Sequence, residues 1–273
     1  MRWLAGLVQA CHLLPSLAVT AFGTAYGALA VDLPLPTLLV LAAALLVGQL
    51  SIGWSNDWVD APRDTTAGRP DKPIPAGLVP RGVVGVAALA AAATCVGVSL
   101  ALGVVPGLVH LVAVASAWAY NARLKSTPAS PVPYVVSFAL LPAVASTAAS
   151  PGQWPHVTVL VAGAALGVAA HFANTVGDGE ADALTGVRGL PQRLGPRRSM
   201  IAMAVFVLFA AAALPIGPQR PGMGGTVVLI AGALLATAAA AVTLRGGPGK
   251  GAFRITLIAV AMVVGGFLAS GQP

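Results

Sequence analysis

The sequence has few charges, few aromatic side chains and almost no cysteine. Of its 273 residues, 8% are charged and 5% are aromatic, whereas 57% are hydrophobic. So little charge cannot cover the surface of a soluble globule, and this composition is typical of proteins that cross the membrane several times. The two cysteines, Cys11 and Cys95, show no metal-ligand or redox spacing, so we interpret them as small apolar residues.

Long hydrophobic runs fill most of the chain. A helix needs about 20 apolar residues to cross a hydrocarbon core of ~30 Å, and the runs are too long and too uniformly apolar for barrel strands. We therefore predict an all-α membrane protein with nine transmembrane helices around a central cavity and one domain over residues 1–273. The predicted spans are 9–30, 36–57, 82–104, 106–122, 131–149, 155–176, 199–216, 224–244 and 252–270.

The basic residues predict the orientation. In the nine-span arrangement all of the 15 lysines and arginines except Arg220 fall on one side of the membrane. Because basic loops stay on the cytoplasmic side, we expect a cytoplasmic N-terminus. This topology also accounts for the net charge of +7, so we expect no nucleic-acid partner.

Acidic residues are gathered rather than spread. Seven of the eight lie in two predicted cytoplasmic segments, each following a helix that runs toward the cytoplasm. The helix dipole is negative at that end and neighbouring carboxylates repel one another, so we expect cations to hold them. The seven are Asp57, Asp60, Asp64, Asp71, Asp178, Glu180 and Asp182.

The two acidic segments share one pattern. Moving the sequence by 118 positions carries Asn56, Asp60 and Asp64 onto a second set of asparagine and aspartates, and the pattern N-x3-D-x3-D-x3-G-x4-P-x3-G occurs twice. An offset of four helices preserves direction through the membrane, so we predict two parallel pseudo-repeats. The second set is Asn174, Asp178 and Asp182.

A spacing of four residues stacks oxygen ligands on one helical face. Pro62 is expected to kink or end that helix before Asp64, and we interpret Asp57, which points off the face, as a supporting or solvated residue. Two such faces suit Mg²⁺, which takes a few carboxylates together with water and substrate phosphate. The predicted metal ligands are Asn56, Asp60, Asp64, Asn174, Asp178 and Asp182.

Basic residues of the same loops complete a phosphate site. They are Arg69, Lys72, Arg123, Lys125, Arg188 and Arg193. The competing interpretation, simple solvated loop charges, does not explain a repeated spacing of acids in so apolar a chain. The histidines are scattered: His12, His110 and His156 lack a partner at helical spacing, and His171 is the one that could face the site, although a core position suits it better.

Three segments resemble the UbiA superfamily of intramembrane prenyltransferases. "NDWVDAPRDTTAGRPDKPIPAG" is similar to the first signature of that family, and "NTVGDGEADALTGVRGLPQRLG" is similar to the second. "YNARLKSTP" looks like the Tyr-x4-Lys segment after the fourth helix. The nine-helix pattern matches as well, so the resemblance covers essentially the whole chain. The resemblance implies two Mg²⁺ ions and a prenyl diphosphate substrate. It also implies catalytic roles for Asp60, Asp64, Asp178, Asp182 and Lys125, with Asn56, Arg69, Lys72, Tyr120, Arg123 and Arg188 around the metal and the diphosphate.

The implied reaction is transfer of a prenyl group to a lipophilic acceptor, aromatic or quinone-like, through an allylic carbocation. Two departures, Gln9 and His12 in the first helix, where many relatives carry an arginine, leave the acceptor open. A terpene cyclase, which needs no acceptor, is the close alternative, and an ion-coupled transporter is a distant one. We expect a multi-pass protein of the plasma membrane, in contact with the bilayer, whose site faces the cytoplasm.

Overall fold

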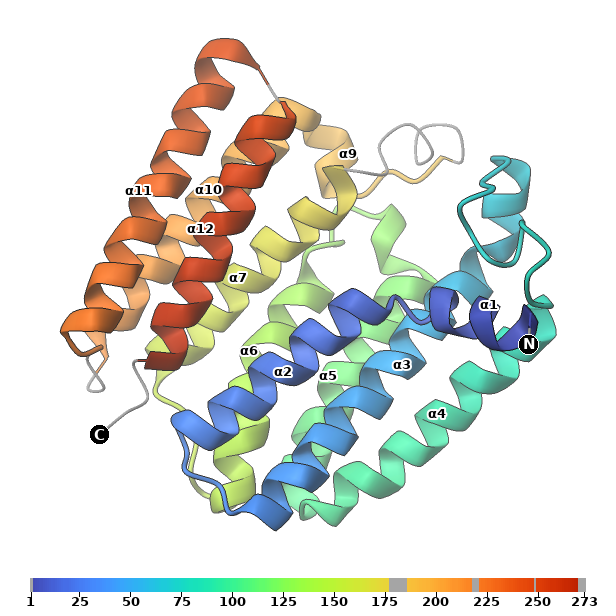
Figure 1. Cartoon of the computed structure of the whole chain (residues 1–273), viewed down its shortest axis with the longest axis horizontal. Helices are drawn as coiled ribbons and strands as arrows, with labels where there is room; N and C mark the ends of the chain where they lie inside the picture. The colour runs from blue at the N-terminus through green and yellow to red at the C-terminus, as the bar shows by residue number, and fades with distance from the viewer. Residues whose placement is uncertain (1, 177–185, 218–220, 248, 270–273) are drawn as a thin grey trace.

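The apolar runs of the sequence form helices, and no strand occurs among the residues that the structure describes. The structure is a computed structural model that describes residues 2–176, 186–217, 221–247 and 249–269 (Figure 1). Its α-helices are α1 (Arg2–Ala10), α2 (Leu13–Leu29), α3 (Leu35–Thr66), α4 (Arg81–Ala101), α5 (Val104–Ala122), α6 (Val132–Ala149), α7 (Val157–Val176), α9 (Leu190–Leu194), α10 (Pro196–Ala213), α11 (Met223–Gly246) and α12 (Lys250–Ala269). Two 3₁₀ turns, η1 (Leu124–Ser126) and η2 (Leu214–Ile216), follow α5 and α10.

The number of spans agrees with the sequence. Eight of the described helices are long and apolar enough to cross a membrane, and the bent pair of α1 and α2 brings the number to nine if it counts as one span. The predicted all-α membrane fold is therefore confirmed. The first span differs from its prediction, because a bend of 55° separates the short α1 from α2.

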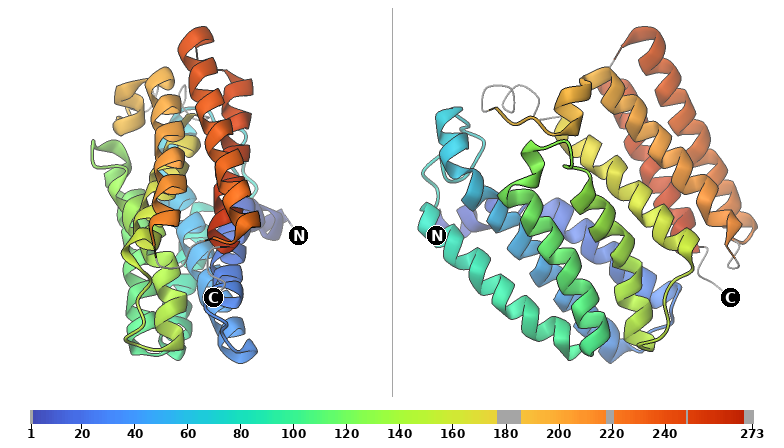
Figure 2. Two further views of the ribbon diagram at one scale, coloured as in Figure 1. Left: turned by 90° about the vertical axis from the view of Figure 1, so that its left-hand side faces the viewer. Right: turned by 180° about the vertical axis from the view of Figure 1, so that it is seen from behind.

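Consecutive helices pack side by side and form a closed ring. Each long helix from α2 to α12 contacts the next one in the chain, and α12 returns to α2. The ring closes on aromatic contacts: the Phe267 ring of α12 lies 5.4 Å from Phe22 and 5.5 Å from Tyr26 of α2. Figure 2 shows the same bundle from the side and from behind.

The three motif segments gather at one end of the bundle. The helices α3 and α7 run in the same direction and finish at the end where the 67–80 loop, η1 and α9 lie (Figure 1). An offset of four helices between the two acidic segments predicts that both lie at the same end of the bundle, as they do here for Asp60 and Asn174. Charged residues far apart in the chain are thus brought to one face of the membrane protein.

The helix α3 continues through Pro62, so the expectation that it ends before Asp64 is wrong. Pro62 lies inside the helix, which runs on to Thr66. A proline cannot donate a hydrogen bond to the carbonyl four residues before it, which here is that of Trp58. Arg81 Nε donates to that oxygen at 3.1 Å, so the freed acceptor is satisfied and the helix persists.

Candidate active site

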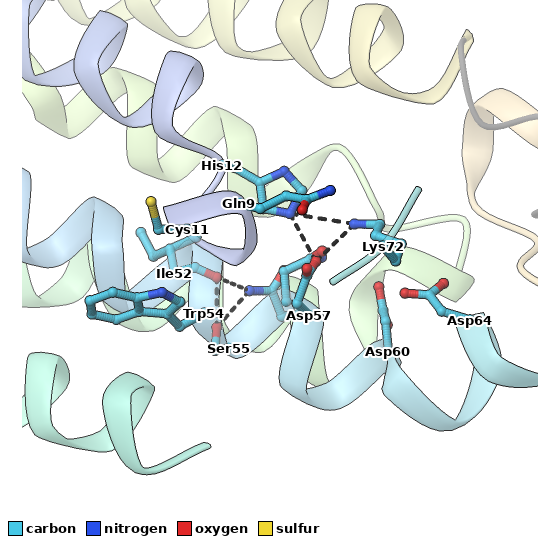
Figure 3. Close-up of polar contacts among 12 residues, drawn as sticks. Gln9, Cys11, His12, Ile52, Trp54, Ser55, Asp57, Asp60, Asp64 and Lys72 are labelled. Atoms are coloured by element: carbon cyan, nitrogen blue, oxygen red, sulfur yellow. Dashed lines mark hydrogen bonds and ion pairs between the residues drawn. The ribbon is translucent and has the colours of Figure 1, made fainter. Parts of the chain in front are cut away.

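The last turns of α3 carry three buried carboxylates. Asp57, Asp60 and Asp64 are only 3%, 5% and 3% exposed. Their carboxyl groups lie along the same side of α3, toward Lys72 (Figure 3). Buried carboxylates are rare unless charge partners hold them, so the partners decide what this face can do.

Cations from two segments hold the outer pair. Lys125 of η1 donates to Asp60 Oδ1, and Arg63 Nη2 lies 3.0 Å from Asp60 Oδ2 and 3.8 Å from Asp64 Oδ1. Burial lowers the pKa of Lys125, and the neighbouring Asp60 opposes that shift. The Tyr-x4-Lys segment is therefore placed directly against the first acidic motif.

Asp57 is buried, so of its two interpretations, a supporting or a solvated residue, the solvated one is wrong. Its Oδ1 accepts a hydrogen bond from Lys72 Nζ at 2.8 Å and lies 3.0 Å from His12 Nε2 (Figure 3). Lys72 thus contacts Asp57 in this structure, whereas the resemblance placed it on diphosphate. The loop that carries Lys72 and the bend between α1 and α2 that carries His12 both lie over the third turn from the end of α3, so both side chains reach Asp57.

A polar cavity of about 270 Å³ opens beside this cluster. Arg69 pairs with Asp71 at its rim, with Arg69 Nη2 2.7 Å from Asp71 Oδ2. That pairing lowers the pKa of the Asp71 carboxyl. The cavity is lined by Gln9, His12, Asp57, Arg69, Asp71, Lys72 and Pro73.

Asn56 belongs to an amide network between α3 and α5. Its Nδ2 donates to Asn121 Oδ1 at 3.2 Å, and Asn121 Nδ2 donates to Ser55 Oγ at 2.7 Å and to the Ile52 carbonyl at 2.9 Å. Asn121 is buried, and nothing in its sequence context except the neighbouring Tyr120 indicates its role. The network fixes the side of α3 from which Asn56 can present its oxygen.

The end of α7 has aromatic surroundings. Asn174 Nδ2 donates to the Tyr134 hydroxyl at 2.9 Å. The ring of Tyr134 lies 5.2 Å from Tyr120 and 4.9 Å from His171, centroid to centroid. His171 is buried and lies 3.0 Å from Ser130 Oγ, so it takes the core position expected of it.

The remaining predicted residues are placed in part. Arg123 and Arg188 lie at the motif end of the bundle with exposed side chains, and Arg193 Nε donates to the Arg188 carbonyl at 2.8 Å. Asp178, Glu180 and Asp182 lie outside the described residues. The predicted second half of the metal site is therefore represented here by Asn174 alone.

The described residues fit half of a magnesium site. Among them no three His, Cys, Asp or Glu side chains are grouped to hold a metal ion. Asp60 and Asp64 nevertheless offer hard oxygen donors, and both are already neutralised by Lys125 and Arg63. Such a donor set, completed by phosphate oxygens, is the kind that Mg²⁺ takes.

A sequence comparison identifies the family. The profile of the UbiA prenyltransferase family matches residues 16–263, which is most of the chain. The chain belongs to the UbiA prenyltransferase family. The match includes both acidic segments and the Tyr120–Lys125 segment.

Solved structures of UbiA homologues share the fold. One from Archaeoglobus fulgidus, bound to DMAPP and Mg²⁺, has 16% identity and a TM-score of 0.72, with 97% of each chain covered. The apo homologue from Aeropyrum pernix K1 has 20% identity and a TM-score of 0.69, with 91% of this chain and 95% of that one covered. A structure described for digeranylgeranylglyceryl phosphate synthase has 15% identity and a TM-score of 0.74, with 99% of both chains covered. No curated protein matches the sequence.

Proposed function

We propose that this UbiA family member is a Mg²⁺-dependent prenyltransferase that moves a prenyl group from a prenyl diphosphate to a lipophilic acceptor, aromatic or quinone-like. The observation that carries the proposal is the contact of Lys125 with the buried Asp60. A cation and a carboxylate held together at the end of an apolar bundle match a substrate with a charged head and a hydrocarbon tail. Support also comes from the A. fulgidus homologue, whose structures contain DMAPP or GPP with Mg²⁺.

The two acidic segments would hold the metal. Asn56, Asp60 and Asp64 supply oxygens from α3, and we assign the same role to Asn174, Asp178 and Asp182. Bound Mg²⁺ would stabilise the charge that develops on the diphosphate as it leaves.

The basic side chains would bind the diphosphate. Lys125 already lies against Asp60, so it can contact a phosphate held at the same carboxylate. Arg69, Lys72, Arg123 and Arg188 surround this end of the bundle, and preorganised cations of this kind stabilise a leaving anion without reorganisation. The apolar helices would receive the prenyl tail and keep water from the allylic carbocation.

Tyr120 and Tyr134 would line the path of the prenyl group. Their rings meet edge to face at 5.2 Å close to Asn174. Aromatic faces attract cations, so these rings can face the carbocation without competing for it as strong nucleophiles. We also propose one domain over the whole chain, in the plasma membrane with the site toward the cytoplasm, as the basic loops favour.

The test uses the purified full chain with dimethylallyl, geranyl, farnesyl and geranylgeranyl diphosphates. We expect the release of inorganic diphosphate to require Mg²⁺. We expect mass spectrometry to detect a prenylated product only when hydroxylated aromatic or quinol acceptors are added. Hydrocarbon products without an acceptor would instead identify the cyclase.

A matched pair of variants tests whether the acidic motif of α3 is required for diphosphate release. Asp60→Asn should lower diphosphate release by about 10³-fold. Asp32→Asn should leave it unchanged, because Asp32 is exposed in the loop between α2 and α3 and has the positive φ of 56° that asparagine tolerates. Equal activity of Asp60→Asn and the unaltered chain would refute the proposed function.

A further inference from the structure

The cavity beside Asp57 includes Arg69 and Lys72, which the proposal above places near the diphosphate, but its other lining residues have no role in the ionisation of a prenyl diphosphate. Three segments form it: the bend between α1 and α2, the third turn from the end of α3, and the loop at Arg69–Pro73. Its volume is about 270 Å³, enough for the polar part of a small molecule. Its walls combine cationic and anionic side chains, so the question is which chemical group they would recognise.

His12 presents an open hydrogen-bond acceptor in this cavity. Nε2 lies 3.0 Å from Asp57 Oδ1 and 3.5 Å from Lys72 Nζ. Lys72 Nζ donates to the same Oδ1 at 2.8 Å. Since a carboxylate only accepts, we assign the ring proton to Nε2, so that both nitrogens donate to that one oxygen. The other ring nitrogen, Nδ1, makes no hydrogen bond to any residue that the structure describes. In this tautomer Nδ1 carries a lone pair and can take a proton.

The second oxygen of Asp57 is also unpartnered. Asp57 is 3% exposed, and its Oδ2 is buried without a hydrogen-bond partner among the described residues. A buried polar atom left unpaired is costly, and native proteins usually satisfy it with a protein group, water or ligand. Asp57 Oδ2 is closed off, whereas the His12 side chain is 40% exposed, so Nδ1 is the acceptor that a ligand with a hydrogen, such as a hydroxyl group, can reach.

The cavity lies next to the proposed diphosphate site. Asp57 precedes Asp60 by three residues on α3, which is a rise of about 4.5 Å along the helix axis. Lys72 donates to Asp57 at 2.8 Å, and its ammonium end points toward Asp57 and His12 (Figure 3). A hydroxyl bound at Asp57 is therefore within about one helical turn of the diphosphate.

The other three histidines have different surroundings. His110 lies 2.8 Å from Ser99 within the bundle, and His171 lies 3.0 Å from Ser130. His156 is exposed and contacts Thr158 at the start of α7, at the opposite end from the motifs. Of the four, all of which the structure describes, His12 is the one paired with a carboxylate.

We propose that His12, held by Asp57, accepts the hydroxyl proton of the prenyl acceptor. This inference rests on the proposed function. As the C1–O bond of the prenyl diphosphate breaks, its electron pair leaves with the diphosphate, and the acceptor forms a new bond to C1. The acceptor O–H proton passes to His12 Nδ1, and Asp57 stabilises the resulting imidazolium. The charged groups facing His12 are Asp57 from α3 and Lys72, Arg69 and Asp71 from the loop.

The test separates ionisation from proton transfer. The full chain, His12→Asn and the control His156→Asn are given geranyl diphosphate and Mg²⁺, with and without para-substituted phenols whose hydroxyl acidity spans the assay pH. Asparagine suits position 12 because the backbone there has φ 50° and ψ 56°, a left-handed conformation that asparagine tolerates. Released diphosphate and prenylated phenol are measured separately, and thermal unfolding checks that each variant is folded.

We expect His12→Asn to keep the slow release of diphosphate without an acceptor, in which water bonds to C1 and a prenyl alcohol forms. We expect it to lose about 10²- to 10⁴-fold in the prenylation of phenols that remain protonated. The loss should shrink for phenols already ionised at the assay pH, and His156→Asn should match the unaltered chain. A loss that is equal for all phenols, or no loss at all, would overturn the role of His12. Diphosphate release without prenylation of any phenol by the unaltered chain would overturn the hydroxyl-bearing acceptor, whereas no release at all would overturn the proposed function.

Discussion

The helices α3 and α7 carry the same asparagine at equivalent places but surround it differently. Asn56 donates to Asn121 and stands beside buried carboxylates that cations hold. Asn174 donates to the hydroxyl of Tyr134, in a group of aromatic rings with His171. The shared sequence pattern places the two asparagines at equivalent positions of α3 and α7, whereas the neighbouring helices determine which side chains each asparagine contacts.

This difference suggests a division of labour within one site. The α3 side is built for charge, because Lys125, Arg63 and Lys72 reach its three aspartates. The α7 side, as far as the structure describes it, surrounds Asn174 with the aromatic rings of Tyr134, Tyr120 and His171. Changes on the α3 side should therefore affect the release of diphosphate most.

The largest effect is expected from Asp60→Asn. It removes the charge that Lys125 and Arg63 share, and one metal-binding oxygen with it, so diphosphate release should fall by about 10³-fold, or ~4 kcal/mol. Steady-state assay of inorganic diphosphate measures this. A loss of tenfold or less would mean that the α3 side is not the charged half of the site.

Lys125→Gln should come next. The variant keeps the polar character of the side chain but removes the cation at Asp60, and a loss of about 10²-fold in diphosphate release is expected. Lys250→Gln is the matched control, because Lys250 is exposed at the start of α12. Equal rates for the two variants would contradict a role for Lys125 at the diphosphate.

Gly53→Ala should disturb the α3 side through packing alone. A Cβ at Gly53 would fall against the carbonyl oxygen of Cys11, where the α1–α2 bend crosses α3. We expect the free energy of unfolding to fall by about 1–3 kcal/mol, measured by denaturation in detergent. Gly97→Ala in α4 is the control, and it should raise the free energy of unfolding. Nothing lies within 4 Å of its added Cβ, and alanine favours the helix.

Tyr134→Phe probes the α7 side. It removes the hydroxyl that accepts from Asn174 but keeps the ring beside Tyr120, so a change of about 1 kcal/mol, or tenfold at most, is expected in the rate of product formation. An effect as large as that of Asp60→Asn would show that the two sides do not differ as described.

The smallest effect is expected at the rim of the cavity. Asp71 is 59% exposed at its side chain and pairs with Arg69, so Asp71→Asn should change the free energy of unfolding by less than about 0.5 kcal/mol. Because the pairing lowers the pKa of Asp71, its small contribution is present near neutral pH and is lost as the pH falls through that pKa. Thermal unfolding at pH 7 and at pH 3 measures both points.

The sequence was sufficient for the fold and for one face of the site. Hydrophobic runs predicted the spans, and the four-residue spacing placed Asp60 and Asp64 on one buried side of α3. Contacts between distant segments could not be read in this way. His12 and Asp57 are 45 residues apart and meet because α1 and α2 are bent by 55°.

Pro62 is a second case in which a contact from a distant segment could not be predicted from the local sequence. A local rule allowed the helix to end at Pro62, and that ending was outweighed by Arg81, which satisfies the carbonyl of Trp58 from the start of α4. The solvated interpretation of Asp57 was wrong for a similar reason, because its two partners come from a bend and a loop. Periodicity finds faces of helices, whereas partners supplied by tertiary structure have no periodic signal.

The central claim is that α3 and α7 contribute to a single site for metal and diphosphate. The most direct test is a double-mutant cycle of Asp60→Asn and Asp178→Asn, read as Mg²⁺-dependent release of diphosphate from geranyl diphosphate. Residues that act as a unit are strongly non-additive. We therefore predict that each single variant loses most of the activity and that the double variant is little worse than either. Two independent losses that simply multiply, or an Asp178→Asn variant as active as the unaltered chain, would contradict the account.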